Sequence, residues 1–367
     1  MIKQLKDFTI KLVAGANVVT VLIMLLLGYS GYVNPQSFSY LTFASLLFPI
    51  FLLANMCFIF FWLIFKWRMI WIPVLGYLLA FLPISIYLPI NMPAAMPNGV
   101  IKVMSYNVCG YHDYLGKSTF DAVYDYIKNS DASIVCLQED NDLAGKLRGR
   151  MNKLLPYRDS VKLGVYIPNG LSIYSRYPII RKERIYYESV ANGSVAFFLK
   201  VEGDTIIVIN NHLESNHLSA KDRSRYKDIL KGQMDENEAK AESKKLIKKL
   251  IDAGMQRAPQ ADAVHNFICE HSQYPIIVCG DFNDNPLSYT RRVIAEGLRD
   301  CFVDAGSGFG ITFNQKGFYV RIDNLLCSEH YEPYNCKVDN KISVSDHYPI
   351  YCWLKKQSKQ QKKHEKQ

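Results

Sequence analysis

Three long apolar segments dominate the first part of the chain. They cover residues 12–33, 40–65 and 69–90, and none of them contains Asp, Glu, Lys, Arg or His. Each is longer than the roughly 20 residues that a helix needs to cross a bilayer. The prolines within these segments are compatible with membrane helices, because neighbouring helices satisfy the backbone groups that a kink frees. The pattern predicts three transmembrane helices that form a membrane anchor over residues 1–92.

Two other interpretations of these segments fit less well. Buried helices of a soluble core would have to be apolar on all sides three times in succession, whereas such helices normally carry one apolar stripe. A cleaved signal peptide is disfavoured, because no small-residue cleavage site follows the first segment and two more segments come after it. No ionisable residue lies inside the segments, so we expect an anchor and not a transport path.

From residue 100 onward, short β-branched apolar runs alternate with polar turns. Runs such as 101–104, 205–209 and 275–278 have the length and composition of buried strands. Residues 235–254 mix both signs of charge around one apolar stripe, which indicates a helix with one face on a core. The pattern is typical of an α/β domain.

The boundaries of that domain follow from composition. Residues 93–99 combine prolines, a glycine and small side chains, and we expect them to form a linker. Residues 100–355 are then long enough for one domain with a substantial core. The end of the chain, residues 356–367, is rich in lysine and has no apolar residue, so we expect a basic disordered tail. Much of the net charge of +9 lies in this tail and says little about a binding groove.

Charges beside the apolar segments predict an orientation. Three lysines lie within residues 1–11, and Lys66 and Arg68 separate the second segment from the third. The stretches 34–39 and 91–100 carry no Lys or Arg. Because short cytoplasmic flanks are enriched in Lys and Arg, the rule places the N-terminus in the cytoplasm and the α/β domain on the outer face. We therefore expect an integral membrane protein with an extracytoplasmic domain.

Five polar patches each follow a predicted strand. They are SYNVCGY at 105–111, CLQED at 136–140, NNHLES at 210–215, CGDFNDNP at 279–286 and SDHYP at 345–349. Strand ends project such side chains into a cleft at the rim of a sheet. The carboxylates and amides among them are ligands for a hard cation such as Mg²⁺, with Mn²⁺ as a substitute. His212 and His347 are left for proton transfer.

In this order, the five patches resemble the endonuclease/exonuclease/phosphatase superfamily. One GDFN or SDH sequence would be weak evidence, but five patches in order and at similar intervals are a strong signal over residues 100–355. The resemblance implies a four-layer α-β-β-α sandwich, in which two packed β-sheets are flanked by helices. It also implies a metal-dependent hydrolase that acts on phosphoester bonds.

The resemblance assigns a role to each residue of the patches. Asn107, Glu139 and Asp346 would hold Mg²⁺, which neutralises the charge that develops on the phosphate as water attacks in line. His347 would act as a base or as a phosphate clamp. Asp323 would fix the orientation of the His347 ring and favour its charged form.

The remaining roles concern water, leaving group and phosphate. Asp281 and Asn283 would position the attacking water or the phosphate, and His212 would protonate the leaving oxygen or hydrogen-bond to the phosphate. The sequence leaves the assignment of acid and base open. Arg176 matches a family segment near bound phosphate, and the other interpretation is an ordinary surface arginine in a turn.

Departures from the family's branches narrow the resemblance. Asn141 stands where abasic-site endonucleases carry a lysine, and Cys279 stands where inositol-phosphate phosphatases carry a tryptophan. His212 is similar to the histidine of the deoxyribonuclease and sphingomyelinase branches. The glutamate that supports this histidine in pancreatic-type deoxyribonucleases has no match between residues 160 and 174.

Three functions remain open at this point. The first is a membrane-anchored, Mg²⁺-dependent phosphodiesterase that acts on nucleic acid. The second uses the same site on a lipid head group or another small phosphoester, next to the lipid bilayer that holds residues 12–90. The third is a non-catalytic membrane scaffold, and the intact set of site residues disfavours it.

Overall fold

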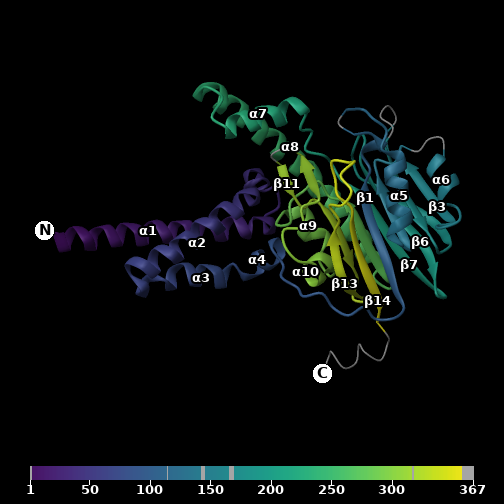
Figure 1. Ribbon diagram of the computed structural model, residues 1–367, viewed down its shortest axis with the longest axis horizontal. Coiled ribbons are helices and arrows are strands. Elements are labelled where there is room, and N and C mark those ends of the chain that lie inside the picture. Colours follow the sequence, from purple (N-terminus) through teal and green to yellow (C-terminus); the bar gives the residue numbers. More distant parts are fainter. Residues whose placement is uncertain (1, 114, 142–144, 165–168, 316–317, 358–367) are drawn as a thin grey trace.

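The chain divides into an elongated helical arm and a broad α/β body that joins one end of the arm (Figure 1). The computed structural model describes residues 2–113, 115–141, 145–164, 169–315 and 318–357. The N-terminus lies at the far end of the arm (Figure 1). The lysine-rich segment 358–367, for which we expect disorder, lies outside the described residues.

The strands of the body form two six-stranded sheets. The first has the order β13-β14-β1-β2-β4-β3 and the second the order β5-β6-β7-β8-β12-β9. The first sheet contains β1 (Val100–Asn107), β2 (Ile134–Gln138), β3 (Tyr157–Lys162), β4 (Gly170–Ser175), β13 (Tyr331–Val338) and β14 (Ile350–Lys356). The second contains β5 (Ile179–Ile185), β6 (Gly193–Val201), β7 (Asp204–His212), β8 (Ile276–Asp281), β9 (Arg299–Asp300) and β12 (Asp323–Cys327). A separate two-stranded ribbon joins β10 (Phe313–Gln315) to β11 (Phe318–Val320).

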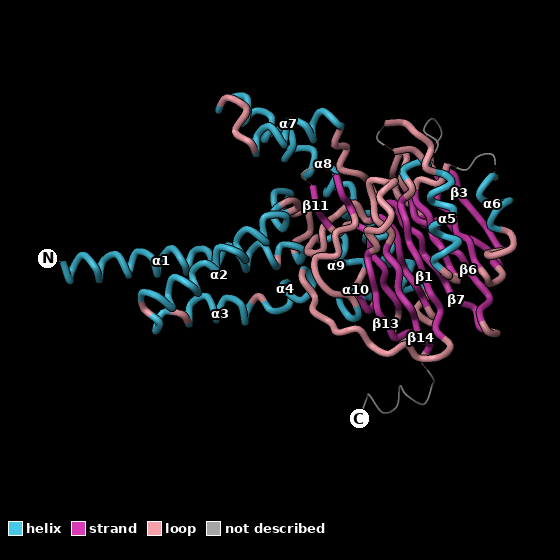
Figure 2. Tube along the Cα trace, in the orientation of Figure 1, coloured by secondary structure: helices cyan, strands magenta, loops and turns pink. Residues whose placement is uncertain are grey.

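Helices cover the outer faces of both sheets (Figure 2). The body contains α5 (Phe120–Ser130), α6 (Lys146–Met151), α7 (Ala220–Leu230), α8 (Glu236–Glu270), α9 (Tyr289–Ile294) and α10 (Cys301–Ala305). Side chains of α5 and α6 pack on the first sheet, and side chains of α8 and α9 pack on the second. A third cluster lies between the sheets and includes Val103, Phe197 and Leu325. The four-layer α-β-β-α sandwich that the sequence predicts is confirmed.

The arm consists of helices and the loops that join them (Figure 2). It contains α1 (Ile2–Gly28), α2 (Phe48–Phe65), α3 (Trp71–Leu79) and α4 (Phe81–Tyr87). Within the described residues, Gln4–Gly28 and Ser39–Phe65 are long and apolar enough to cross a membrane. The α3–α4 pair, bent by 62°, provides a third span if it is counted as one.

The helices of the arm differ from the expected segments in two places. The first helix begins at Ile2 and ends at Gly28, whereas the apolar run covers residues 12–33. A helix can extend beyond the bilayer, so polar residues before residue 12 do not stop it. The third segment breaks at Ala80, shortly before Pro83, because proline clashes with the carbonyl one turn earlier.

The arm is fixed to the body by direct contacts. The guanidinium Nε of Arg292 donates to the carbonyl of Gly31 at 2.8 Å, and Gln36 donates to the carbonyl of Met255 at 2.9 Å. Gly31 lies close to Leu287, and a Cβ added to Gly31 would lie 2.3 Å from the carbonyl oxygen of Leu287. The loop between α1 and α2 is therefore a docked part of the body's surface.

Candidate active site

The site forms where several strands end at the same rim of the sandwich. β1 runs parallel to β2, and β7 runs parallel to β8, so the carboxyl ends of each pair meet at one edge. Asn107 and His212 end β1 and β7, and Glu139 directly follows β2. Asp281 at the end of β8 is in register with Asp323 at the start of the antiparallel strand β12. The fold therefore gathers residues that are far apart in sequence.

Unusual backbone conformations mark this rim. Glu139 and Asn283 both have a φ of 53°, in the left-handed region that non-glycine residues rarely adopt. Gly280 has a φ of 129°, and a Cβ there would lie 2.0 Å from the carbonyl oxygen of Asn211. Such conformations are retained where the surrounding structure holds them, and they cluster at functional sites.

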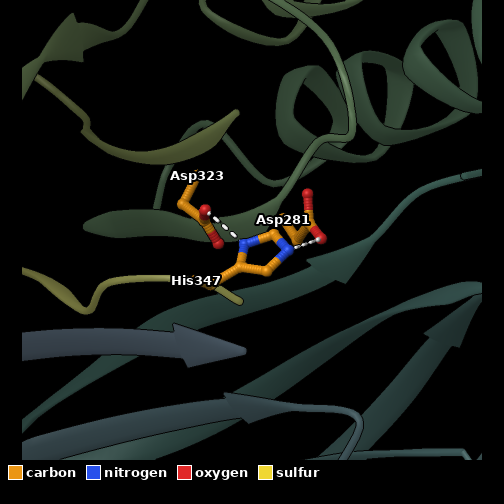
Figure 3. A group of neighbouring side chains, drawn as sticks. All are labelled: Asp281, Asp323 and His347. Atoms are coloured by element: carbon orange, nitrogen blue, oxygen red, sulfur yellow. Dashed lines mark hydrogen bonds and ion pairs between the residues drawn. The ribbon is translucent and has the colours of Figure 1, made fainter. Parts of the chain in front are cut away.

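His347 lies between two carboxylates (Figure 3). Its Nδ1 is 2.8 Å from Oδ2 of Asp323, and its Nε2 is 3.5 Å from Oδ2 of Asp281. Burial alone would lower the pKa of His347, but Asp323 and Asp281 outweigh it and raise the pKa well above its usual value. The two carboxylates therefore favour the cationic form of the ring, with a proton on each nitrogen.

Neighbouring groups hold this pair in place. The hydroxyl oxygen of Thr312 accepts hydrogen bonds from the backbone N–H groups of Ile322 and Asp323, at 2.9 and 3.0 Å. The ring of Phe313 packs edge-on against His347 with a centroid distance of 5.1 Å. These contacts fix both Asp323 and the imidazole plane, which supports the predicted orienting role of Asp323.

Asn169 faces Nδ1 of His212, and Glu139 Oε1 lies 3.6 Å from Nε2 of the same ring. The amide nitrogen of Asn169 donates to the carbonyl of Ala191 at 2.9 Å and lies 3.2 Å from Nδ1 of His212. The Ala191 carbonyl fixes which end of the amide faces the ring, so Nδ1 of His212 accepts and Nε2 carries the proton. Burial lowers the pKa of His212, in agreement with a neutral ring. The surroundings of the two histidines therefore shift their pKa values in opposite directions.

Asp281 is the common neighbour of the polar groups. Its Oδ2 accepts from the Asn107 amide at 3.1 Å and lies 3.9 Å from Nε2 of His212. Its Oδ1 accepts from the backbone N–H of Asn283 at 2.8 Å. Burial raises the pKa of Asp281 to about 6, which is a suitable value for a proton acceptor near neutral pH.

Glu139 and Asp346 present the oxygens that best suit a divalent cation. Burial raises the pKa of Glu139, the Asn107 amide opposes this, and the charge of Asp346 adds to it. Two carboxylates that repel one another at the mouth of a cavity fit a hard cation, which would offset the repulsion. Asn107 turns its amide nitrogen toward Glu139, at 3.1 Å from Oε1, while its oxygen accepts from the Cys109 N–H at 3.0 Å. In this orientation, the amide nitrogen of Asn107 donates to the Glu139 carboxylate.

Asp281, Asp323 and His347 form a second group with metal-ligand chemistry. One ligand atom from each lies within 4.8 Å of the others. However, both ring nitrogens of His347 face carboxylates, so a metal on this ring would have to replace one of these contacts. This geometry favours an Asp–His–Asp ion-pair network.

One predicted residue is not brought to this rim. Arg176 follows β4, which runs antiparallel to β2, and Ser175 is paired with Ile134 at the start of β2. The Arg176 guanidinium forms an ion pair with Asp131. The structure therefore places Arg176 at the opposite edge of the sheet from Asp281 and His347.

A cavity of about 410 Å³ opens above these residues. His212, Asp281, Asn283, His347, Glu139 and Asp346 all line it. Thr42, Phe43 and Leu46, from the loop between α1 and α2, line it as well. Sequence reasoning missed Asn169, Thr312 and this wall of the arm, since none of them belongs to a recognisable motif.

The sandwich fold and its rim of carboxylates and histidines define a class of phosphoester hydrolases. Residues 104–347 match the Endonuclease/Exonuclease/phosphatase family, and the chain belongs to this family. It is a hydrolase of the type that acts on phosphoester bonds. Residues 10–87 match a second family, which is described as a domain of unknown function (DUF8431).

Solved structures share the fold at low sequence identity. The D. rerio TDP2 complexed with single strand DNA product is 15% identical, with a TM-score of 0.50 over 70% of this chain and 100% of that one. An endonuclease/exonuclease/phosphatase from Beutenbergia cavernae is 16% identical, with a TM-score of 0.50 over 70% of this chain and 72% of that one. No curated protein matches the chain. At these identities the neighbours support the fold alone.

Proposed function

We propose that this chain is a membrane-anchored, divalent-metal-dependent phosphodiesterase. The observation that carries the proposal is the position of His347, which is held between Asp323 and Asp281 on the floor of a cavity that Glu139 and Asp346 also line. A fixed cation beside a carboxylate of raised pKa suits the binding of a phosphate next to a water-activating base.

Each residue of the site has a separate role in the proposed hydrolysis. Nε2–H of His347 donates to a non-bridging oxygen of the phosphate and holds it in line with a water molecule beside Asp281. Asp281 accepts the proton of that water as its oxygen attacks phosphorus. Nε2–H of the neutral His212 donates to the leaving oxygen, which then takes a proton from solvent. Asn283 holds the Asp281 carboxylate through its backbone N–H.

Glu139 and Asp346 are the residues that would hold the metal, with Mg²⁺ as the proposed ion. When bound, such an ion neutralises charge on the phosphate oxygens during attack. Asn107 then donates to the Glu139 and Asp281 carboxylates and keeps both in place.

The arm supports an extracytoplasmic position of the body. Lys66 and Arg68 lie in the turn between α2 and α3, at the end of the arm away from the body (Figure 1). Lys6 and Lys11 lie in the N-terminal part of α1, on the same side. Positive charge at this end favours the cytoplasm. A reporter fused after Lys355 that is active only in the cytoplasm would contradict this orientation.

Two substrate classes fit the site. Nucleic acid is one, and the D. rerio TDP2 structure with its single strand DNA product is a precedent within the same fold. A lipid phosphodiester is the other, because residues of the arm line the cavity. The scaffold interpretation is disfavoured by the ordered contacts among His347, Asp323 and Asp281.

The test uses full-length protein in detergent with bis(4-nitrophenyl) phosphate, a generic phosphodiester. We expect release of 4-nitrophenol with Mg²⁺ or Mn²⁺, loss of release with EDTA, and loss of release in His347→Asn. His265→Asn, on α8 outside the cavity, is the matched control and should retain activity. Folded protein that binds the metal and cleaves neither this diester, nucleic acid nor lipid would contradict the proposal.

A further inference from the structure

The catalytic cavity has two chemically different sides. One side carries His347, Asp281 and His212, as described above. The other side is apolar and comes from three parts of the molecule. It consists of Phe43 and Leu46 of the arm, Leu250 of α8, and Phe318 and Val320 of β11. A site with a phosphate-binding side and an apolar side suits an amphiphilic substrate.

The apolar side of the cavity is held rigidly. Thr42 lies against Gly254 of α8, where a Cβ would approach to 2.9 Å. The side chain of Asn34 donates to the hydroxyl of Tyr289 at 3.1 Å. Together with the Arg292 and Gln36 contacts, these interactions fix the segment that leads to Phe43 against the body. The arm is therefore a wall of the site and not a loose tether.

This wall is continuous with the surface of the arm that faces outward. Leu47 directly follows the cavity residue Leu46, and Ile50 and Leu53 on α2 are also exposed. Ser39–Phe65 has the length and apolarity of a membrane span. The cavity residue Leu46 therefore belongs to the same apolar segment as Ile50, whose exposed side chain a bilayer would cover.

The charges around the cavity do not favour a nucleic-acid strand. Such a strand is held by several Lys or Arg contacts to successive phosphates. Among the described lining residues, the arginines are Arg223 and Arg257. Arg257 is buried, with Asp284 at 3.2 Å and the carbonyl of Glu214 at 2.9 Å, so it is already paired within the protein. Arg223 donates to the carbonyl of Leu218 at 2.8 Å and is the one arginine of the described lining that is left for a further phosphate, fewer than the several contacts that a strand needs.

We infer that the substrate is a membrane lipid with a phosphodiester head group. Its phosphate binds at His347 and Asp281, and its acyl part lies along Phe43 and Leu46 toward the bilayer. This inference requires that the proposed phosphodiesterase activity is correct, and it names the substrate of that same site. Hydrolysis breaks one P–O bond of the head group with water, which adds OH to phosphorus and H to the leaving oxygen.

The test compares a lipid with its own head group. Full-length protein in mixed micelles is given phosphatidylethanolamine, phosphatidylglycerol or sphingomyelin, the matching deacylated glycerophosphodiesters, and single-stranded DNA, each with Mg²⁺ and with EDTA. We expect kcat/KM for at least one lipid to exceed that of its soluble counterpart and of DNA by about tenfold or more, because burial of acyl carbons contributes to binding.

A matched pair of variants isolates the wall. Leu46 and Leu47 are neighbours with similar exposure, 39% and 41%, but only Leu46 is among the described residues that line the cavity. We expect Leu46→Gln to lower the ratio of kcat/KM for the lipid to kcat/KM for bis(4-nitrophenyl) phosphate about tenfold. We expect Leu47→Gln to leave this ratio unchanged.

The possible outcomes separate the two proposals. If DNA or the small diester is cleaved by a His347-dependent reaction while all lipids are untouched, the phosphodiesterase proposal stands and the lipid inference fails. An equal loss in Leu46→Gln and Leu47→Gln also overturns the lipid inference. Silence on every substrate, including the small diester, overturns both.

Discussion

The arm and the body follow opposite rules for placing polar and apolar side chains. In the arm, Leu53 and Phe60 are more than half exposed, whereas Asn17 and Asn55 are fully buried and hydrogen-bonded to each other at 3.0 Å. In the body, large apolar side chains such as Phe197 are buried between layers. An apolar exterior around a polar contact suits lipid, and the reverse suits water. The catalytic rim lies where these two surfaces meet.

The largest effect is expected from a change to the polar active site of the body. We expect Asp281→Asn to lower kcat/KM by about 10²–10⁴-fold, because the amide cannot accept the proton of the attacking water. The assay is hydrolysis of the generic diester at saturating Mg²⁺. Asp252→Asn, on the surface of α8, is the control and should be neutral. Full activity in Asp281→Asn would exclude the proposed base.

A second test measures how much a buried ion pair contributes to the stability of the body. Arg291 and Asp300 form a buried ion pair, and removal of one partner in Asp300→Asn should cost about 3–5 kcal/mol of unfolding free energy. Asp304→Asn breaks the more exposed pair with Arg299 and should cost at most about 1 kcal/mol. Denaturant unfolding of both variants measures the difference, and equal losses would contradict it.

The same pair predicts a pH dependence. Burial alone would raise the pKa of Asp300, but Arg291 and Arg321 outweigh it and hold the pKa below its usual value. A depressed carboxyl pKa stabilises the fold above the unfolded-state value of about 4, and this contribution is lost as pH falls through the folded-state pKa. The stability gap between wild type and Asp300→Asn should therefore shrink below about pH 4. A constant gap would contradict the pairing.

A smaller loss of activity is expected for Asn169, which belongs to no sequence motif. Asn169→Ala removes the donor that fixes the tautomer of His212, and we expect a loss of about 10–100-fold in kcat. Asn169→Asp should instead raise the pKa of His212, which NMR titration of the ring can follow. A pKa of His212 that is unchanged in both variants would show that Asn169 does not position the ring.

The smallest effect concerns the polar contact inside the arm. Asn55→Leu removes the hydrogen bond with Asn17, and such contacts in membranes contribute about 0.6–1.7 kcal/mol. Reversible unfolding of the arm in bicelles measures this loss. Cys57→Ala, at an exposed position on the same helix, is the control and should be neutral.

The sequence predicted the sandwich because five motifs of one family stand in order on recognisable strands. It also predicted that Glu139, His212, Asp281 and His347 lie together, because each belongs to one of these motifs and follows a predicted strand. Arg176 lies elsewhere because β4 is antiparallel to β2, and a polar residue after an antiparallel strand falls on the opposite edge. Strand direction cannot be read from local periodicity.

Other features depend on tertiary contacts that local patterns do not encode. Asn169 supports His212 across a loop, and a single asparagine there carries no motif. Phe43 and Leu46 belong to an apolar run that predicts membrane contact, yet docking of their loop on α8 makes them part of the site. Such contacts follow from packing between distant segments.

We propose that the arm spans the membrane and holds the phosphodiesterase site at the bilayer surface. The first experiment places nitroxide labels at two exposed leucine positions, Leu53 on α2 and Leu230 on α7, in protein whose exposed Cys57 and Cys269 are replaced by serine. In proteoliposomes, we expect the label at 53 to collide with lipid-soluble oxygen and the label at 230 with a water-soluble nickel complex. Equal access of the nickel complex to both labels would contradict it.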